Sequence, residues 1–270
     1  MNEIPLLSVV TATYNRAPSL PACFSSVLAL HGTISSLEHI IVDNMSSDAT
    51  AGIVAEYAQG APYKVRYIRE PDSGIYDALN KGIRSARGIY VHLLHSDDAY
   101  ADPAMLCDLA RSLEEGAFDI IACAIRYRKE ADEEATVWEP SYRRRFRQCR
   151  FPHTGCIVKR AFYESHGVYD TRFKIVSDAL YMANVFPSAH FMMLPVVLVE
   201  MATTGISSRD SLRLRFEQLA LLLRSNNLPL YYKVKRAPIL LGRVLQYLVE
   251  TRFSDFGLGQ RRAKQRRHGG

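Results

Sequence analysis

Apolar and polar positions follow two alternating patterns along the first hundred residues. Short, β-branched apolar stretches predict strands at residues 7–12, 38–42, 64–68 and 89–94. Apolar positions with helical spacing predict helices between them, at residues 18–30, 48–57 and 76–86. This alternation favours an α/β fold with a doubly wound, mostly parallel sheet flanked by helices, in which ligands bind at the carboxyl ends of the strands.

The alternation continues beyond residue 101. It predicts a helix at 101–113, a strand at 119–125, an exposed charged excursion at 126–139, a strand at 155–158, a helix at 177–186 and a strand at 194–199. The remaining residues are predicted to be helical, with interruptions at Pro229 and Pro238 and a disordered end at 261–270. We place a boundary near Ser208, between an α/β domain at residues 1–208 and a helical C-terminal extension at residues 209–270.

The extension is strongly basic. Residues 209–270 contain 14 Lys or Arg and 4 Asp or Glu, whereas residues 1–208 contain 20 and 24. Basic segments bind anionic partners, either a membrane surface or a nucleic acid, and a solubilising tail is the alternative. Apolar residues recur there with helical spacing, at Leu241, Val244, Leu245 and Leu248. This pattern is typical of a helix on an anionic membrane, and packing against the first domain is the alternative.

Composition limits the class of protein. With 270 residues, 48% hydrophobic and 23% charged, the chain is an ordinary globular protein, and its longest apolar stretch, at 191–199, is far shorter than the roughly 20 residues that span a bilayer. Residues 1–20 lack the pattern of a secretory signal, so we expect a cytoplasmic protein, peripheral on the inner face of the membrane if the extension binds there.

The five cysteines form no C-x-x-C pair, so we expect them to be buried apolar residues. A catalytic thiol at Cys156, near His153, is the weaker alternative.

Candidate chemistry lies in acidic residues that directly follow strands. Asp43 ends the second predicted strand, and Asp97 and Asp98 follow the fourth. Adjacent carboxylates repel each other unless a cation joins them, and a divalent metal held by carboxylates and phosphate oxygens is the usual arrangement. The pair therefore indicates a metal and a phosphorylated ligand, with a solvated loop or a helix cap as the alternative. The sequence contains none of the phosphate-loop, dinucleotide-binding, zinc-protease or nucleophile-elbow motifs.

Four segments in combination resemble a known family. They are LLSVVTATYNR (6–16), IIVDNMSSD (40–48), EPDSGIYDALNKGIRSARGIYVHLLHSDD (70–98) and GVYDTRFKIVSDALYM (167–182). Over residues 5–208 the chain resembles inverting family 2 glycosyltransferases of the GT-A fold, above all bacterial enzymes of surface polysaccharide or glycolipid synthesis. The resemblance implies transfer of a sugar from a nucleotide-sugar, with UDP as the expected nucleotide, to a hydroxyl of a glycan or lipid-linked acceptor, with Mn²⁺ or Mg²⁺ as cofactor.

The resemblance also implies residue roles. The nucleotide contacts are expected at Thr11, Thr13, Tyr14, Arg16, Asp43, Asp72, Lys81 and Asp97. Asp97 and Asp98 match the family's metal motif, and Asp178 matches the base that takes the proton of the acceptor hydroxyl. Asp170 is the second candidate for the base. Helix capping is the alternative role for Asp43 and for Asp178, with Ser177 as a rival cap, and the helix surface is the alternative for Lys81.

The chain departs from the family pattern at three points. Many relatives have His-Gln at His153 and Thr154, which puts the acceptor contact in doubt, and Gly-Gly at Thr204 and Gly205. No histidine downstream matches a third metal ligand, so the metal is expected to be held by Asp98, the nucleotide and water and to bind weakly without the nucleotide. An inactive GT-A scaffold or partner subunit is the alternative function, disfavoured because the acidic residues occur together. A nucleic-acid-binding protein is disfavoured because the extension lacks interleaved aromatic residues.

Overall fold

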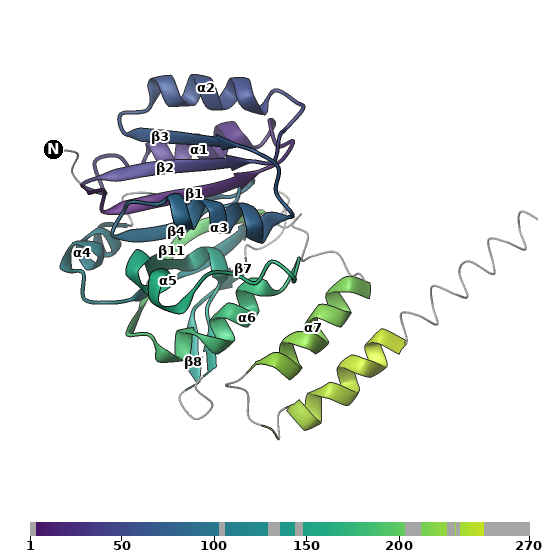
Figure 1. The fold of residues 1–270 in the computed structure, drawn as a ribbon. Coiled ribbons are helices and arrows are strands. Elements are labelled where there is room, and N and C mark those ends of the chain that lie inside the picture. The colour runs from purple at the N-terminus through teal and green to yellow at the C-terminus, as the bar shows by residue number, and fades with distance from the viewer. Residues whose placement is uncertain are drawn as a thin grey trace, which may run out of the picture.

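A large mixed sheet flanked by helices organises the chain (Figure 1). The computed structural model describes residues 4–102, 106–128, 136–143, 148–202, 212–225, 230 and 233–245. Within these residues the strands of the large sheet follow the order β3-β2-β1-β4-β10-β6-β11-β5, and β7 pairs with β6. The predicted α/β, mostly parallel, doubly wound architecture is confirmed, and so is a helical C-terminal extension.

The first four strands are parallel and form one half of the sheet. They are β1 (Leu7–Thr13), β2 (Leu37–Asp43), β3 (Lys64–Arg69) and β4 (Tyr90–Leu93), connected by α1 (Leu20–Leu28), α2 (Thr50–Gly60) and α3 (Ile75–Ser85). Strand β1 pairs with both β2 and β4 in parallel. Every residue of β1 and β2 is buried, as expected for central parallel strands covered by helices on both faces.

The second half of the sheet is mixed. Its strands are β5 (Ala99–Tyr100), β6 (Ile120–Arg128), β7 (Thr136–Trp138), β10 (Cys156–Lys159) and β11 (Phe191–Ala202). Strand β10 runs antiparallel to β4 and β6, whereas β6 and β11 are parallel. The helical elements are α4 (Cys107–Glu115), α5 (Arg160–His166), α6 (Ser177–Asn184) and the short η3 (His153–Gly155) and η4 (Phe186–Ser188), and β8 (Ser141–Arg143) pairs with β9 (Gln148–Arg150) apart from the large sheet.

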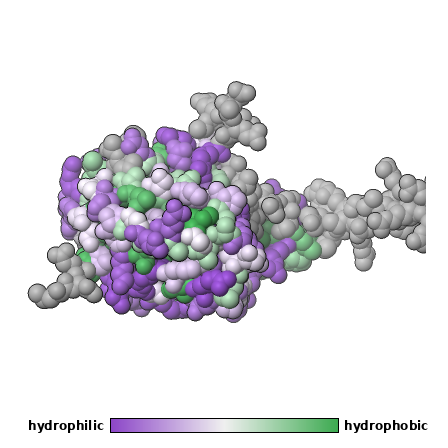
Figure 2. All heavy atoms as spheres, turned by 90° about the horizontal axis from the view of Figure 1, so that it is seen from above, coloured by the Kyte–Doolittle hydropathy of each residue, from purple (hydrophilic) through white to green (hydrophobic). Residues whose placement is uncertain are grey.

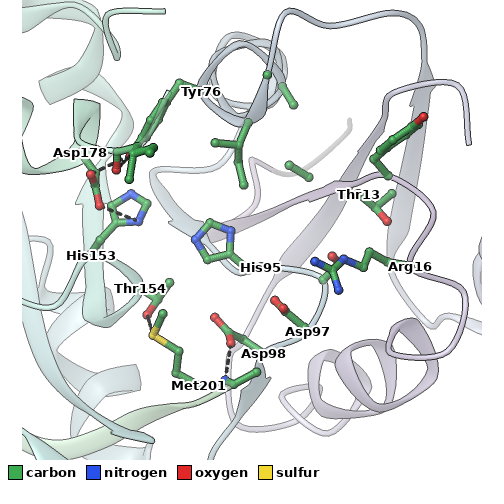
Figure 3. Close-up of a pocket in the computed structure, with 18 of the residues that line it drawn as sticks. Thr13, Arg16, Tyr76, His95, Asp97, Asp98, His153, Thr154, Asp178 and Met201 are labelled. Atoms are coloured by element: carbon green, nitrogen blue, oxygen red, sulfur yellow. Dashed lines mark hydrogen bonds and ion pairs between the residues drawn. The ribbon is translucent and has the colours of Figure 1, made fainter. Parts of the chain in front are cut away.

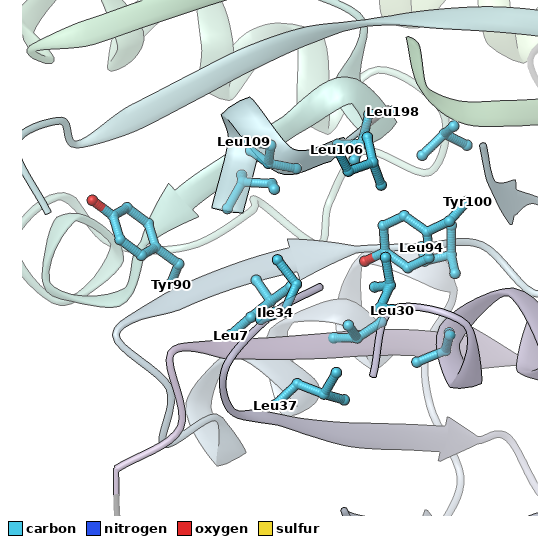
Figure 4. Packing of buried hydrophobic residues seen from close by; sticks show 14 of the residues in the cluster. Leu7, Leu30, Ile34, Leu37, Tyr90, Leu94, Tyr100, Leu106, Leu109 and Leu198 are labelled. Carbon is cyan, nitrogen blue, oxygen red and sulfur yellow. The ribbon is translucent and has the colours of Figure 1, made fainter. Parts of the chain in front are cut away.

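Two apolar cores lie on opposite faces of the sheet. Helices α1, α2 and α4 contribute to the first, which also contains Leu7, Leu94 and Leu198 (Figure 4). Helices α3, α5 and α6 contribute to the second. Helix α3 approaches β1 so closely that a Cβ at Gly82 would lie 2.1 Å from a methyl carbon of Val10, so this contact requires glycine. The outer face seen in Figure 2 is largely hydrophilic, with scattered hydrophobic residues.

The C-terminal extension packs against the domain. Helix α7 (Leu212–Arg224) contacts α6, and a further helical segment at residues 233–245 follows it (Figure 1). A third apolar cluster lies between α7 and the residues around α6; its members are Phe173, Val176, Leu180, Ile175, Leu214, Ala220 and Leu221. Helix α7 therefore packs against the domain, whereas the alternatives of membrane binding and packing concern the later segment around Leu241. In the part of the chain that the structure describes, no helix is long and apolar enough to cross a bilayer.

Several details differ from expectation. Pro238 lies inside the helical segment 233–245 and does not interrupt it; the backbone hydrogen bond that a proline removes there would involve the carbonyl of Val234, an exposed residue. Helix α5 was not predicted, and β11 is longer than expected because it continues through Pro195 with shifts in register. The excursion at 126–139 partly extends β6 and partly forms β7.

Several features of the sequence analysis that concern the C-terminal extension lie outside the described residues. They are the boundary at Ser208, Pro229, Leu248 and the end at 261–270.

Candidate active site

A pocket of about 510 Å³ opens where the strand order changes direction, between the carboxyl ends of β1 and β4. The chain proceeds from β1 outward to β2 and β3 and then returns to β4 on the other side of β1, so the loops after β1 and β4 diverge and leave a crevice. Seven of the predicted site residues line it: Thr13, Tyr14, Arg16, Asp72, Asp97, Asp98 and Asp178. The volume is within the range of small-molecule sites.

The loops after β1 and β2 are fastened together. Asn15 has a left-handed backbone conformation (φ 50°), which Asn tolerates better than most residues. Its N–H donates to Ser46 Oγ at 2.9 Å, and its Oδ1 accepts the N–H of Ser47 at 2.9 Å. These contacts fix the backbone on both sides of Asn15, where Tyr14 and Arg16 face the pocket.

Asp72 belongs to a tight turn beside this loop. Its N–H donates to Asn44 Oδ1 at 2.9 Å, and its own Oδ1 accepts the N–H of Gly74 at 2.8 Å. Gly74 has a φ of 131°, which favours glycine, and is the N-cap residue of α3. Burial raises the pKa of the Asp72 carboxyl, with the Gly74 N–H and Lys81 opposing the shift.

Three predicted nucleotide contacts are not among the residues that line the pocket. Thr11 is fully buried, and its Oγ1 lies 3.0 Å from His39 Nε2. Asp43 is also fully buried, and its carboxylate accepts hydrogen bonds from Ser46 and Tyr67. The Lys81 ammonium is engaged by the carbonyl of Pro71 and by the carboxylate of Glu70, at 2.6 and 3.0 Å.

The Asp43 contacts also address its alternative role. The carboxylate bonds Ser46 in the turn that precedes α2, and helix α2 has no side-chain cap from its N-cap residue, Ala49. Asp43 thus stabilises the loop after β2 rather than the first turn of α2 itself. Its second oxygen accepts the Tyr67 hydroxyl at 2.6 Å and lies 3.5 Å from Arg69 Nε.

Asp98 presents an unsatisfied buried oxygen to the pocket. Only 2% of the residue is exposed; Oδ1 accepts the N–H of Ala202 at 2.9 Å, and Oδ2 has no hydrogen-bond partner among the described residues. Burial raises the pKa of this carboxyl, and the neighbouring Asp97 adds to the shift while His95 opposes it. A buried carboxylate oxygen without a donor is costly, and a cation would satisfy it.

The wider donor set is small. Among the described residues, no group of three or more His, Cys, Asp or Glu side chains could hold a metal by itself. Asp97 lies beside Asp98 in the pocket, and its backbone carbonyl accepts a hydrogen bond from Arg128. The two carboxylates fit a hard divalent cation whose other ligands are phosphate oxygens and water.

Asp178 lies on the opposite side of the pocket from Thr13 and Arg16, with His95 between them (Figure 3). It is the second residue of α6, and its Oδ1 lies 2.8 Å from the hydroxyl oxygen of Tyr76 on α3. The hydroxyl of Tyr76 also lies 2.8 Å from the carbonyl oxygen of Ile175. Burial and the Asp178 carboxylate raise the pKa of Tyr76, so the phenol is a neutral donor.

The alternatives for Asp178 find no support in its contacts. In the described chain, no side chain of the first residues of α6 makes a capping hydrogen bond, so neither Asp178 nor Ser177 acts as the cap. Asp170, the second candidate for the base, is paired with Arg172 at 2.7 Å and is not among the lining residues. The Arg172 contacts lower the pKa of Asp170.

His153 lines the pocket beside Asp178. Its Nδ1 lies 3.9 Å from Asp178 Oδ2, and its Nε2 lies 3.0 Å from the hydroxyl oxygen of Tyr169. Burial lowers the pKa of His153 to about 4, although the Asp178 carboxylate opposes the shift, so the ring is neutral near pH 7.

A catalytic thiol at Cys156 is not supported, because that side chain is buried, burial raises its pKa, and its Sγ donates to the carbonyl of Pro152.

The remaining cysteines agree with the expectation of small apolar residues. Cys23, Cys123 and Cys156 are buried and all five are free thiols, although Cys107 is exposed.

Sequence reasoning missed several polar residues of the pocket, among them Asn44, Tyr76, His95 and Lys174. Each of these four lies within four residues of a predicted site residue: Asp43, Asp72, Asp97 and Asp178 respectively. Adjacency in the sequence was therefore the available signal. It does not tell which neighbour faces the pocket. Thr204 and Gly205 lie outside the described residues.

Comparisons with known proteins place this chain among glycosyltransferases. The family model for Glycosyl transferase family 2 matches residues 8–172. An uncharacterized glycosyltransferase of Bacillus subtilis, EpsJ, is 32% identical over 134 residues, which are 50% of this chain and 38% of EpsJ. A glycosyltransferase of PGL/p-HBAD biosynthesis from Mycobacterium bovis is 26% identical over 183 residues, 64% of this chain and 67% of that protein. Chondroitin synthase of Escherichia coli is 33% identical over 53% of this chain, which corresponds to only 20% of that protein.

Solved structures share the fold. The crystal structure of S. aureus TarS 1–349 in complex with UDP has a TM-score of 0.61 at 18% identity, covering 88% of this chain and 71% of that one. The mannosyltransferase PcManGT from Pyrobaculum calidifontis, in complex with GDP-Man and Mn²⁺, has a TM-score of 0.57 at 18% identity, covering 90% and 70%. At these identities the likeness shows the fold alone.

Proposed function

The chain belongs to glycosyl transferase family 2, and on that premise we propose that it transfers a sugar, with inversion at the anomeric carbon, from a UDP-sugar to a hydroxyl of a glycan or lipid-linked acceptor. The proposed context is the synthesis of a bacterial surface polysaccharide or glycolipid. One observation carries the proposal: a single pocket has a carboxylate at Asp178 on one side and the strand-end carboxylates Asp97 and Asp98 on another (Figure 3).

Inversion requires a base on the acceptor side of the sugar. We assign this role to Asp178, which accepts the proton of the acceptor hydroxyl as its oxygen attacks the anomeric carbon and the diphosphate leaves on the opposite face. Tyr76 orients the carboxylate. Its single hydroxyl proton serves two acceptors, Asp178 Oδ1 and the Ile175 carbonyl, so it can donate to only one at a time. Once Asp178 has gained a proton, it can donate to the Tyr76 oxygen and both contacts are satisfied.

The donor side is proposed to be the wall made by the loops after β1, β2 and β4. Thr13, Tyr14, Arg16, Asp72 and Asp97 line it and remain our proposed nucleotide contacts. Thr11, Asp43 and Lys81 would act from behind this wall, because their polar atoms bond to neighbouring residues. For Asp43, bonding the ring N–H of uracil would require the carboxylate to exchange one of those partners.

Asp98, with Asp97, is the proposed holder of a divalent cation, Mn²⁺ or Mg²⁺. The unpartnered Oδ2 of Asp98 supports this assignment, and the Mn²⁺ bound to PcManGT is consistent with it. When bound, the cation would neutralise charge on the departing diphosphate. UDP as the nucleotide is supported by the UDP complex of TarS, whereas GDP-Man in PcManGT is the main competitor.

For the C-terminal extension we propose peripheral contact with an anionic membrane, as suits a lipid-linked acceptor. In the helical segment 233–245, Val234, Leu241 and Leu245 are 64, 48 and 55% exposed and share one helix face by their spacing. Lys235 is exposed about 100° around the helix from Val234, so its charge borders this face and complements anionic lipid. The protein should sediment with phosphatidylglycerol vesicles at low salt and not with phosphatidylcholine vesicles; failure with both would contradict the membrane contact.

Calorimetric titration tests the donor site. We expect UDP to bind wild-type protein more tightly with Mn²⁺ than without it, and more tightly than GDP or TDP. In Asp98→Asn, Mn²⁺ should no longer strengthen the binding of UDP, because the substitution removes the charge of a metal ligand. We expect the affinity for UDP in the presence of Mn²⁺ to fall by about 10- to 100-fold. Asp108→Asn, which changes an exposed ion pair with Arg111 on α4, is the matched control and should bind as wild type. If no nucleotide binds under any condition, the inactive scaffold becomes the better description.

A further inference from the structure

A carboxylate of the C-terminal extension holds the segment directly before Asp178. Glu217 on α7 accepts the backbone N–H groups of three consecutive residues. The Lys174 N–H lies 3.0 and 3.1 Å from its two oxygens, and the N–H groups of Ile175 and Val176 lie 2.8 and 3.2 Å from Oε2. One side chain from the extension thus satisfies three donors of a loop that is 42 residues distant from it in sequence at Ile175.

These three donors precede the first turn of α6. Val176 is the N-cap residue, and within the described chain no side chain of the helix's own start caps it. N–H groups at a helix start lack partners within the helix, and negative charge is stabilising there. Glu217 supplies such a charge next to this end. It therefore favours the loop conformation from which α6, and with it Asp178, begins.

The same loop also carries the contact that orients the carboxylate of Asp178. The Ile175 N–H donates to Glu217, while the Ile175 carbonyl lies 2.8 Å from the hydroxyl of Tyr76. That hydroxyl in turn lies 2.8 Å from Asp178 Oδ1. A displacement of Ile175 would therefore change the position of Tyr76 relative to Asp178.

Apolar packing fixes α7 in the register that this contact requires. Leu214 and Leu221 pack against the cluster of Phe173, Val176 and Leu180, and the guanidinium of Arg224 lies over the ring of Phe173, 5.4 Å from its centroid. Glu217 lies between Leu214 and Leu221 in the sequence, three and four residues from them, so it shares their helix face.

We propose that Glu217 is a positioning residue for the catalytic base, so that the C-terminal extension is a working part of the catalytic site. The inference rests on the proposed role of Asp178. It extends beyond the residues of the family match, which end at residue 172. It also predicts that changes in α7 alter turnover without any contact between α7 and the donor.

Hydrogen–deuterium exchange tests the contact without knowledge of the substrate. In Glu217→Ala, we expect the amides of residues 174–176 to exchange at least tenfold faster than in wild type, because their acceptor is gone. Glu217→Gln keeps an oxygen that accepts and should exchange at an intermediate rate. Glu164→Gln on α5, where the native side chain pairs with Arg160 on the surface, is the matched control. Unchanged exchange in Glu217→Ala would overturn the proposal.

Turnover tests the consequence for Asp178. We would measure release of UDP from UDP-glucose, UDP-galactose and UDP-N-acetylglucosamine, with water in place of the acceptor, together with the Kd for UDP. Glu217→Ala should lower kcat at least tenfold and leave the Kd for UDP within twofold of wild type. Glu217→Gln should recover part of kcat. A parallel loss of UDP affinity, or unchanged kcat, contradicts a positioning role.

Two further outcomes separate this proposal from the one on which it rests. Wild-type protein that neither binds UDP nor releases it from any donor overturns the proposed function, and the positioning role with it. Active wild type with equally active Glu217→Ala overturns only the role of Glu217. If Glu217→Ala does not fold, Glu217→Gln decides alone: lower kcat at an unchanged Tm supports the proposal, and unchanged kcat overturns it.

Discussion

The two walls of the pocket are built in different ways. The donor wall consists of loops that leave adjacent parallel strands. The backbone hydrogen bonds of β1 with β2 and β4 bring these loops side by side, and short contacts such as those of Asn15 then join them. The base wall is the start of α6, which is not part of the sheet. Its carboxylate is held by side chains from other elements: Tyr76 from α3, with His153 from η3 close by, and Glu217 from α7 acting on the preceding loop.

This difference predicts that UDP affinity and turnover respond differently to substitutions. Sheet pairing keeps the strand ends of the donor wall in register when a single side chain is replaced. A wall fixed by a few side-chain contacts loses its geometry when one of them is removed, and a small displacement is costly in rate. We therefore expect substitutions on the base wall to lower turnover while UDP affinity is retained.

The largest effect should come from Asp178→Asn. It removes the base but keeps the size of the side chain, and we expect kcat to fall by about 10³-fold, within the range for loss of a general base. The Kd for UDP, measured by calorimetry, should remain near that of wild type. Asp170→Asn is the matched control, since Asp170 was the second candidate. Equal losses in the two variants would contradict the assignment to Asp178.

Acidification should weaken the sheet behind the donor wall. His39 and His92 are fully buried, and burial lowers their pKa to about 3 and about 4, from an ordinary value of 6.5. Between about pH 6.5 and 4 the unfolded chain binds protons that the folded protein does not, so the free energy of unfolding falls as the pH falls through this range. At pH 5 the loss is about 2 kcal/mol for each histidine.

Urea unfolding at pH 7 and pH 5 measures this dependence. His39→Gln should have a smaller difference between the two pH values than wild type, whatever its stability at pH 7. His31→Gln, at an exposed position, should retain the wild-type difference. A wild-type free energy of unfolding that is equal at both pH values would contradict buried, neutral histidines.

The smallest effect is expected for Tyr76→Phe. The variant keeps the ring but removes the hydroxyl between Asp178 and the Ile175 carbonyl, and we expect kcat to fall about tenfold, the equivalent of roughly 1.4 kcal/mol. The KM for the UDP-sugar should change little, because Tyr76 approaches the base and not the donor loops. Tyr142→Phe, whose ring packs on Phe191 away from this contact, provides the control. A change confined to KM would place Tyr76 on the donor side.

Much of the fold could be predicted because it follows from hydrophobic patterns within short segments of the sequence. The strands at β1 to β4 and the helices between them follow from apolar stretches and helical spacing, and the fold class was confirmed. Helix α5 was missed because it is a seven-residue helix that begins directly after β10. Pro238 was predicted to interrupt a helix, but the helical segment 233–245 continues through it.

Side-chain direction explains which site predictions line the pocket. Thr11 lies within β1, and the period of two along a strand turns it toward the face that α1 and α2 cover, where it meets His39. Thr13 ends the same strand and so reaches the pocket. Asp43 also ends a strand, but Tyr67 on the neighbouring β3 bonds its carboxylate. That cross-strand partner depends on register, which the sequence pattern left open.

The sequence by itself determined the alternation of strands and helices, the placement of acidic residues at strand ends, and the family, because each is encoded in residues close together along the chain. Only the tertiary structure decided how Asp178 is held. Tyr76 lies 102 residues before Asp178 and Ile175 lies 42 residues before Glu217, and side chains so far apart meet only after the sheet has formed and α7 has packed on α6.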